Sequence, residues 1–254
     1  MEIFDVTTLT KAQFDIVQGF LSLGIAAMLA TTIYLFLAQG RVLPKYRQAL
    51  VISGTVTLIA LYHYVRIYDS FTASYSEGAI FNEAYRYVDW LLTVPLLLLE
   101  TIAVLALPAA RRKYLTARLV PASAAMIILG YPGEVTTDFA SKAIWGGLSS
   151  IPFLYILYIL FVELTKTLET QPADVAATVK RLRLLLVATW GVYPISYLLP
   201  MIGIDGANAF VGRQVGYTVA DILAKCLFGL TIYKIARLKS AHDEPAYAAA
   251  EGTH

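Results

Sequence analysis

Seven long apolar segments constrain this chain more than any other feature of its sequence. About 20 apolar residues cross the hydrocarbon core of a bilayer as a helix, and a helix satisfies its own backbone hydrogen bonds there. The expected spans are residues 12–39, 46–67, 83–107, 114–131, 139–168, 173–202 and 209–238. The chain has 254 residues, of which 58% are hydrophobic and only 15% charged, whereas soluble domains carry about 25% charged residues. The sequence therefore predicts an all-α membrane protein with seven transmembrane helices.

The spans fill nearly the whole chain, and nothing marks a second domain. We expect one seven-helix domain at residues 1–239 and a disordered tail at residues 240–254, which are rich in alanine and charge. The first residues lack the basic stretch, short apolar core and cleavage site of a removable signal peptide. The single cysteine, Cys226, is expected to pack as a small buried residue. Pro108 and Pro132 are expected to follow helix ends, where proline is common.

The distribution of lysine and arginine predicts how the helices cross the membrane. Most of the 20 basic residues lie around the connections that follow the first, third and fifth spans and at the end of the seventh span. They are Arg41, Lys45, Arg47, Arg111, Arg112, Lys113, Arg118, Lys166, Lys180, Arg181, Arg183, Lys234, Arg237 and Lys239. Because cytoplasmic loops are enriched in lysine and arginine, we expect an extracellular N-terminus and a cytoplasmic C-terminus.

A lysine near the middle of the last apolar segment indicates a functional site. Lys225 lies within residues 215–230, and Asp221 precedes it by four residues, a spacing that places both side chains on one helix face. An ammonium group at the centre of a bilayer costs about 3 kcal/mol or more. The pair is open to three interpretations: a structural ion pair, a gating charge, or an amine bound covalently to an aldehyde as a Schiff base.

The third span carries a column of charged and polar residues. Asp89 and Thr93 share a helix face, Arg86 precedes Asp89 by three residues, and Glu100 returns to nearly the same face at 3.6 residues per turn. One explanation is that Arg86 pairs with Asp89 while Glu100 reaches the cytoplasmic interface. With the acids and the lysine of the last span, however, this column supplies the compensating charges that a buried cation requires. We expect Asp89 to accept a proton from a Schiff base and Glu100 to return one from the cytoplasmic side.

Residues on the neighbouring spans predict a ligand slot around this column. His63 is expected at the depth of Asp89, where a hydrogen bond would tune the carboxylate, although a lone histidine in an apolar helix is more often structural. Aromatic and small residues nearby are typical of a slot for a flat apolar ligand, or of ordinary helix packing. These residues are Trp90, Met126, Gly130, Gly146, Trp190, Tyr193 and Pro194.

At these residues the chain resembles the microbial rhodopsins, seven-helix proteins that bind retinal through a Schiff base. The resemblance covers nearly all of residues 14–238, and its motifs are RYVDWLLTVP at 86–95, WGVYP at 190–194 and DILAK at 221–225. It implies that Lys225 carries all-trans retinal and that Asp89 and Asp221 form the counter-ion. It also implies that Asp89 is the primary proton acceptor and Glu100 the cytoplasmic donor.

The resemblance implies further roles by position. Asp89, Thr93 and Glu100 look like the triplet of the bacterial outward proton pumps proteorhodopsin and xanthorhodopsin, and His63 matches the histidine that pairs with the acceptor there. Leu97 matches a position where leucine goes with green absorption. Arg86 would shape the field on the release side, and Thr93 would hydrogen-bond Asp89. The expected walls of the retinal slot are Trp90, Met126, Gly130, Trp190, Tyr193 and Pro194.

Several segments resemble the xanthorhodopsin branch, which includes the rhodopsin of Gloeobacter: GYPGE at 130–134, IWG at 144–146 and GYTVAD at 216–221. Gly146 matches a glycine that opens a window toward the retinal ring in carotenoid-binding members, which implies a carotenoid, a xanthophyll, as a second pigment. The alternative is that Gly146 eases helix packing. Arg213 falls where archaeal pumps carry one of two release glutamates, and no acidic pair is evident nearby, so the release group stays open.

The expected function is a light-driven outward proton pump of the bacterial inner membrane, crossing it several times. Its expected partners are the lipid bilayer, protons and further copies of the chain in a trimer or pentamer. A photosensory rhodopsin and, less favoured, a retinal-free seven-helix transporter or receptor are the alternatives. We expect no enzymatic reaction, no bound metal and no nucleic-acid partner.

Overall fold

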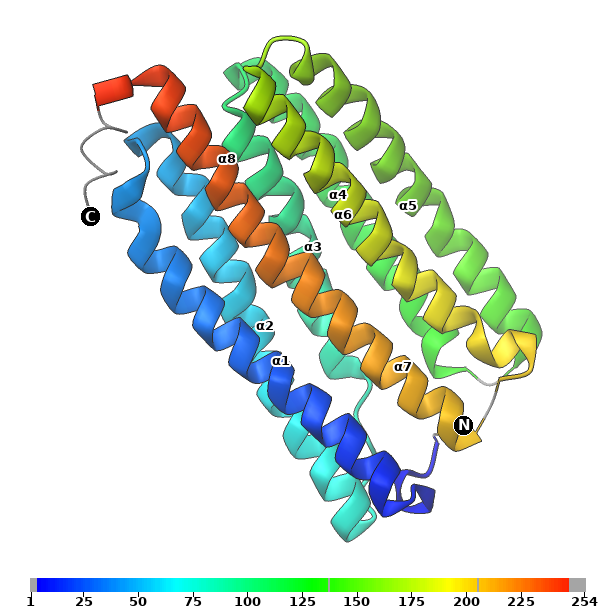
Figure 1. The fold of residues 1–254 in the computed structure, drawn as a ribbon. Helices are drawn as coiled ribbons and strands as arrows, with labels where there is room; N and C mark the ends of the chain where they lie inside the picture. The colour runs from blue at the N-terminus through cyan, green and yellow to red at the C-terminus, as the bar shows by residue number, and fades with distance from the viewer. Residues whose placement is uncertain (1–3, 137, 205, 247–254) are drawn as a thin grey trace.

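The computed structural model describes residues 4–136, 138–204 and 206–246, and within these ranges the chain is helical without any β-strand. The α-helices line up in one elongated bundle, in which α7 and α8 follow each other end to end (Figure 1). They are α1 (Lys11–Leu37), α2 (Pro44–Glu77), α3 (Ala84–Leu105), α4 (Ala109–Val135), α5 (Phe139–Leu168), α6 (Ala173–Leu198), α7 (Gly206–Asp221) and α8 (Phe228–Asp243). A π-helical segment, η4 (Ile222–Leu227), joins α7 and α8 into one continuous rod. With α7, η4 and α8 counted as one, the described chain forms seven long helical rods.

Six of these rods are long and apolar enough to cross a bilayer. The rod α6 is not among them, since its first half carries Lys180, Arg181 and Arg183, but it packs along α7 and α8 in the same bundle. Large apolar side chains such as Ile151 and Leu184 are 65% and 68% exposed, which fits a surface that faces lipid. These features confirm the predicted all-α membrane fold with seven spans.

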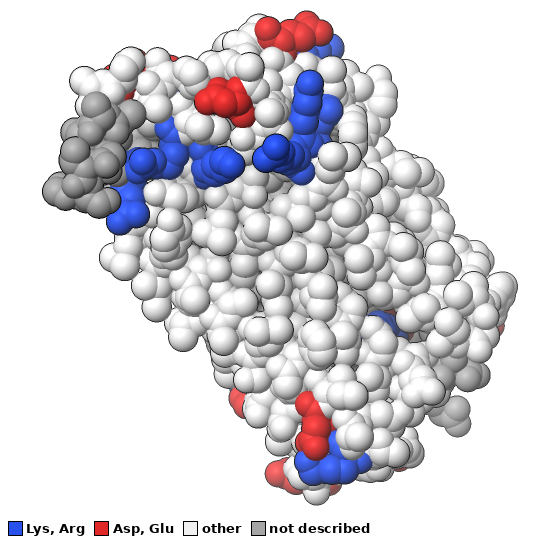
Figure 2. Space-filling model, viewed as in Figure 1, with Lys and Arg blue, Asp and Glu red and all other residues white. Residues whose placement is uncertain are grey.

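Charged side chains gather at the two ends of the bundle and leave a broad uncharged belt between them (Figure 2). We call the end at which α1 begins the N-terminal end, and the end at which α8 finishes the C-terminal end (Figure 1). On the face shown, lysine and arginine concentrate at the C-terminal end, as the loop composition predicted. An uncharged belt of this kind matches the hydrocarbon core of a membrane.

Several helices are longer than the apolar pattern indicated. Helix α2 continues to Glu77, whereas the expected span ended at residue 67, and it stops at Gly78 with a φ of 68°. Its last turns are polar, so hydropathy did not reveal them. Helix α4 continues through Pro132 to Val135, so the prediction that Pro132 follows a helix end was wrong. Bundles tolerate such prolines because neighbouring groups satisfy the freed carbonyl.

Helix α8 extends past the predicted domain boundary at residue 239. The Ser240 side chain is buried, and its hydroxyl accepts a hydrogen bond from the backbone N–H of Leu43 at 3.0 Å. Residues 247–254 lie outside the described residues, so a disordered tail there stays a prediction. The bond ties the C-terminal end of α8 to the start of α2.

The core of the bundle surrounds α3, which packs against α2 on one side and α4 on the other. Five polar residues of α3 are at most 2% exposed, namely Arg86, Asp89, Thr93, Glu100 and Thr101. Lys225 on η4 is also 2% exposed. Charged groups this deeply buried need compensating partners, and these partners define the site.

Candidate functional site

Lys225 sits in a π-helical turn at the centre of the last rod. The segment η4 begins directly after Asp221, and the N–H of Phe228 bonds to the carbonyl of Leu223 five residues earlier. A π-turn inside an α-helix is rare and is often found at functional sites. The π-turn accommodates an extra residue in the turn that presents Lys225. The sequence analysis assumed regular α-helical spacing there and did not predict this turn.

Two carboxylates from different helices compensate the Lys225 ammonium. Its Nζ donates a hydrogen bond to Asp89 on α3, and it lies 3.1 Å from Oδ1 of Asp221 at the end of α7. Arg86 adds a second cation, with its Nη1 3.6 Å from Oδ2 of Asp221. The structure thus brings together the two acids and the arginine that the sequence predicted around one lysine.

The two aspartates differ in their hydrogen bonds. Asp221 accepts bonds from the Tyr64 hydroxyl at 2.8 Å, the Trp90 indole at 3.2 Å and the Tyr193 hydroxyl at 2.7 Å. Such donors stabilise the charged form of a carboxylate. Asp89, by contrast, has an oxygen, Oδ1, without any hydrogen-bond partner among the described residues. Asp89 is therefore the carboxylate with room to take up a proton.

Two predicted contacts of Asp89 differ in the structure. His63 Nδ1 lies 3.9 Å from Asp89 Oδ1, which is too far for a hydrogen bond. The same nitrogen lies 3.0 Å from the carbonyl oxygen of Ile59, one turn earlier on α2. The Thr93 hydroxyl donates to the backbone carbonyl of Asp89 at 2.8 Å rather than to its carboxylate. A hydroxyl in a helix commonly bonds the carbonyl four residues before it.

Glu100 occupies the other half of α3, toward the C-terminal end. It is fully buried, and one carboxyl oxygen accepts a hydrogen bond from the Ser53 hydroxyl on α2. Its other oxygen, Oε1, has no hydrogen-bond partner among the described residues. The explanation in which Glu100 reaches the interface is therefore wrong: it is a buried carboxyl with no cation beside it in any described ion pair.

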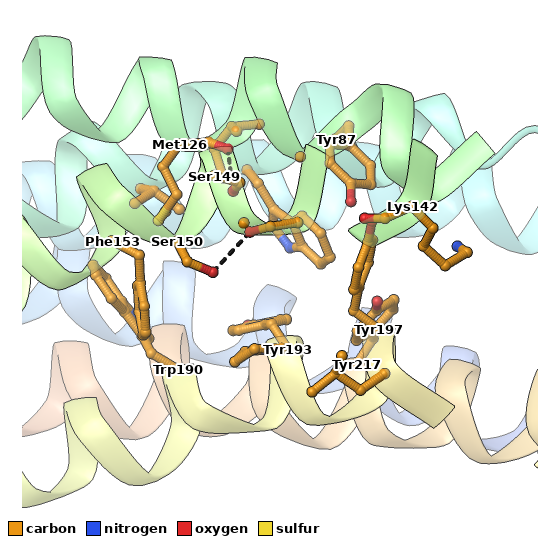
Figure 3. Close-up of a pocket in the computed structure, with 18 of the residues that line it drawn as sticks. Tyr87, Met126, Lys142, Ser149, Ser150, Phe153, Trp190, Tyr193, Tyr197 and Tyr217 are labelled. Carbon is orange, nitrogen blue, oxygen red and sulfur yellow. Dashed lines mark hydrogen bonds between the residues drawn. The ribbon is translucent and has the colours of Figure 1, made fainter. Parts of the chain in front are cut away.

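An apolar cavity of about 340 Å³ extends from Lys225 between α3, α4, α5 and α6. Phe153, Trp190 and Met126 lie toward one end of it, and Tyr197 and Lys142 toward the other (Figure 3). Every predicted slot residue lines this cavity: Trp90, Leu97, Met126, Gly130, Gly146, Trp190, Tyr193 and Pro194. A volume above about 300 Å³ with mostly apolar walls is typical of a small-molecule site.

Gly146 and the neighbouring Gly147 both line the cavity. A Cβ added there would meet Tyr197 Cε1 at 2.8 Å, whereas one added at Gly147 would meet nothing within 4 Å. The Tyr197 hydroxyl donates to the carbonyl of Lys142 at 2.7 Å. In this structure the space beside Gly146 is thus used by a neighbouring tyrosine, which supports the packing explanation, while Gly147 next to it leaves the wall open.

The structure corrects the prediction that no acidic pair lies near Arg213. Its Nη2 donates to Glu83 Oε1 at 2.9 Å, and its Nη1 lies 2.9 Å from Glu134 Oε1. Glu83 and Glu134 are 51 residues apart in the sequence, so only the fold reveals the pair.

Some residues of the site were not found from the sequence. Tyr64 bonds Asp221, Ser53 bonds Glu100, and Gln214 bonds Arg86 at 2.8 Å. Tyrosine, serine and glutamine are common in membrane helices, and no local spacing marks these three.

Comparison with known proteins identifies the family. The sequence profile of the bacteriorhodopsin-like proteins matches residues 15–238. The green-light absorbing proteorhodopsin of Gamma-proteobacterium EBAC31A08 is 31% identical over 218 residues, which cover 85% of each chain. Xanthorhodopsin, a light-driven ion pump with dual chromophore, is 46% identical with a TM-score of 0.88, over 92% of this chain and 97% of that one. A thermophilic rhodopsin is 44% identical with a TM-score of 0.89, over 93% and 98%.

The fold and site define a helical membrane protein with a buried lysine that lines an apolar cavity. The chain belongs to the bacteriorhodopsin-like family, the microbial rhodopsins. The likeness to xanthorhodopsin confirms the predicted resemblance to that branch. Family and apolar rods together confirm a multi-pass protein of the bacterial inner membrane.

The family implies a retinal chromophore, and the residues present fit one. Lys225 offers a buried amine in the wall of the cavity, while Trp90 and Trp190 supply flat apolar walls. Asp89 and Asp221 compensate a cation at the nitrogen. A site with these groups suits an elongated apolar aldehyde bound through the lysine.

Proposed function

We propose that this protein is a light-driven outward proton pump, a transporter rather than an enzyme. The observation that carries the proposal is the contact of Lys225 Nζ with Asp89, whose second oxygen lacks a hydrogen bond, on a helix that also buries Glu100. One helix thereby holds a proton acceptor beside the amine and a separate carboxyl nearer the C-terminal end. Light-driven pumping by xanthorhodopsin supports it by similarity.

When bound covalently through Lys225, retinal supplies light absorption and an isomerisation that alters the proton affinity of the nitrogen. Asp89 accepts the proton from Nζ, since it already receives the hydrogen bond along which the proton moves. Asp221 keeps its charge because three side chains donate hydrogen bonds to it. The division of roles follows from these unequal hydrogen bonds.

Glu100 resupplies the proton to Nζ. A carboxyl buried without a cation beside it holds its proton, because burial penalises the charged form. Ser53 fixes the orientation of that carboxyl by donating to it. Along α3, Arg86 and Glu100 lie on opposite sides of Asp89, the residue that contacts Lys225. Uptake and release therefore take place at opposite ends of the bundle.

The direction of transport rests on the orientation of the chain. Lysine and arginine concentrate at the C-terminal end (Figure 2), and the more basic end of a membrane protein faces the cytoplasm. Glu100 then takes protons from the cytoplasm, and release occurs outside. The buried position of Glu100 favours a pump over a photosensor, because a sensor gains nothing from rapid reprotonation.

Two finer features belong to the same proposal. A carotenoid antenna would lie against the open wall at Gly147, next to Gly146, and xanthorhodopsin has a dual chromophore. Absorption and induced circular dichroism, with and without a hydroxylated carotenoid, test this. A trimer or pentamer is the expected assembly, and native mass spectrometry in lipid nanodiscs measures the number of copies.

Light-driven acidification of a cell suspension tests the function directly. Cells that make the protein and receive all-trans retinal should acidify an unbuffered medium under illumination, and a protonophore should abolish the signal. Alkalinisation would reverse the proposed direction. No light response despite a visible absorption band would favour the photosensor, and no band at all would favour a retinal-free transporter or receptor.

A further inference from the structure

A second group of charged side chains lies outside the Lys225 site, at the N-terminal end of the bundle. Arg213 on α7 sits between Glu83, which precedes α3, and Glu134 near the end of α4, with an N–O distance of 2.9 Å to each. The two glutamates therefore share one cation. Nothing in the proton path described so far uses either of them.

A chain of side chains connects this group to the Lys225 site. Gln214 lies next to Arg213, and its Nε2 donates to Glu83 Oε1 at 3.4 Å while its Oε1 accepts from Arg86 Nη2 at 2.8 Å. Arg86 in turn lies 3.6 Å from Asp221 beside the lysine. A change of charge at the lysine can therefore reach Glu83 through three intervening side chains, those of Asp221, Arg86 and Gln214.

The two glutamates differ in their access to water. The Glu83 side chain is 17% exposed, whereas that of Glu134 is 1% exposed. Only Glu83 can exchange a proton with the bulk solvent directly. Glu134 instead fixes Arg213, which in turn holds the Glu83 carboxylate at the N-terminal end of the bundle.

Building on the proposed pump, we infer that Glu83 is its outlet, the last protein group to carry the proton before release. The O–H bond on Asp89 breaks, a carboxylate oxygen of Glu83 takes the proton, and bulk water then takes it from Glu83. Both carboxylates end as they began, so one proton leaves per cycle. Arg86 does not carry this proton, because a guanidinium does not deprotonate in proteins; it acts through Gln214 as a positioning residue.

A single-flash experiment on protein in lipid vesicles, with a pH-indicating dye on the release side, tests the outlet. In Glu83→Gln, the appearance of the proton at the dye should slow about a hundredfold. Proton transfer from Lys225 to Asp89, which visible absorption monitors, should keep its rate. Glu83→Asp should restore release. The matched control is Glu77→Gln, since Glu77 is an exposed glutamate at the same end of the bundle and should release at the wild-type rate.

Time-resolved infrared spectroscopy gives an independent readout. A transient C=O band of a protonated carboxyl should disappear in Glu83→Gln and shift in frequency in Glu83→Asp, while Glu77→Gln keeps it. If Glu83→Gln does not accumulate, the shift in Glu83→Asp decides. Wild-type release kinetics with an unshifted band would remove Glu83 as the outlet and leave the pump intact, whereas a wild type that releases no proton in light would overturn both.

Discussion

At the scale of single residues, the site depends on unequal surroundings for similar groups. Asp89 and Asp221 both contact Lys225 Nζ, yet Asp221 accepts three hydrogen bonds from side chains of other helices and Asp89 keeps one oxygen without a partner. Two acids beside one amine can thus take different parts, one as a fixed charge and one as a proton acceptor.

Asp89→Asn should leave a coloured protein that does not pump. The amide cannot accept the proton from Lys225, so transport should fall by at least about a hundredfold. The absorption band should move to longer wavelength, because a negative charge beside the nitrogen no longer stabilises the ground state. Light-induced pH change and an absorption spectrum of the purified variant measure both effects, and wild-type pumping by this variant would refute the acceptor assignment.

Glu100→Gln should slow only the late reprotonation of Lys225. The amide holds no transferable acidic proton, so that step should slow by about a hundredfold, while proton transfer to Asp89 keeps its rate. Flash photolysis resolves the two steps in one trace. Glu77→Gln serves as the control because Glu77 is exposed and far along α2. An unchanged photocycle in Glu100→Gln would exclude Glu100 as the donor.

At the scale of helices, close packing of α1 against α2 positions a residue of the site. Tyr64 on α2 is fully buried and donates to Asp221, and its ring lies against Gly24 of α1, where an added Cβ would meet ring atoms at 2.5 and 2.6 Å. Small residues allow membrane helices to approach each other closely. Gly24 lies on a helix that contributes no polar residue to the site, yet it determines where Tyr64, which donates a hydrogen bond to Asp221, can lie.

Gly24→Ala should destabilise the protein by about 1–3 kcal/mol, the range for overpacking a well-packed core. The displaced Tyr64 should also weaken its bond to Asp221 and shift the absorption band. Gly19→Ala is the matched control on the same helix, since a Cβ there meets nothing within 4 Å. Thermal bleaching midpoints of the two variants measure the difference, and equal midpoints would contradict the packing argument.

At the scale of the whole molecule, charge distribution sets the direction of the bundle. Basic residues gather at the C-terminal end (Figure 2), which we expect in the cytoplasm. The proposed donor and the proposed outlet lie toward opposite ends of α3, with Glu100 toward the basic end and Glu83 at the other. Reversing the bundle would therefore reverse the pump without changing the site.

Cysteine labelling tests the orientation. The native Cys226 is buried, so wild-type protein should react little with a membrane-impermeant maleimide. Ser76→Cys at the end of α2 should be labelled on intact spheroplasts, and Glu244→Cys, after α8, only in inverted vesicles. Both positions are exposed. The opposite pattern would place the N-terminus in the cytoplasm.

The sequence by itself determined the seven spans, the buried lysine and the acids on the third helix, because apolar length and charge spacing act locally along a helix. It failed where helices leave the apolar belt, as at the polar end of α2 and at Pro132 in α4. The tertiary structure alone decided which groups meet across helices. The bonds from Tyr64 and Ser53 and the glutamate pair around Arg213 depend on residues far apart in the chain, whose contacts arise only when the helices pack.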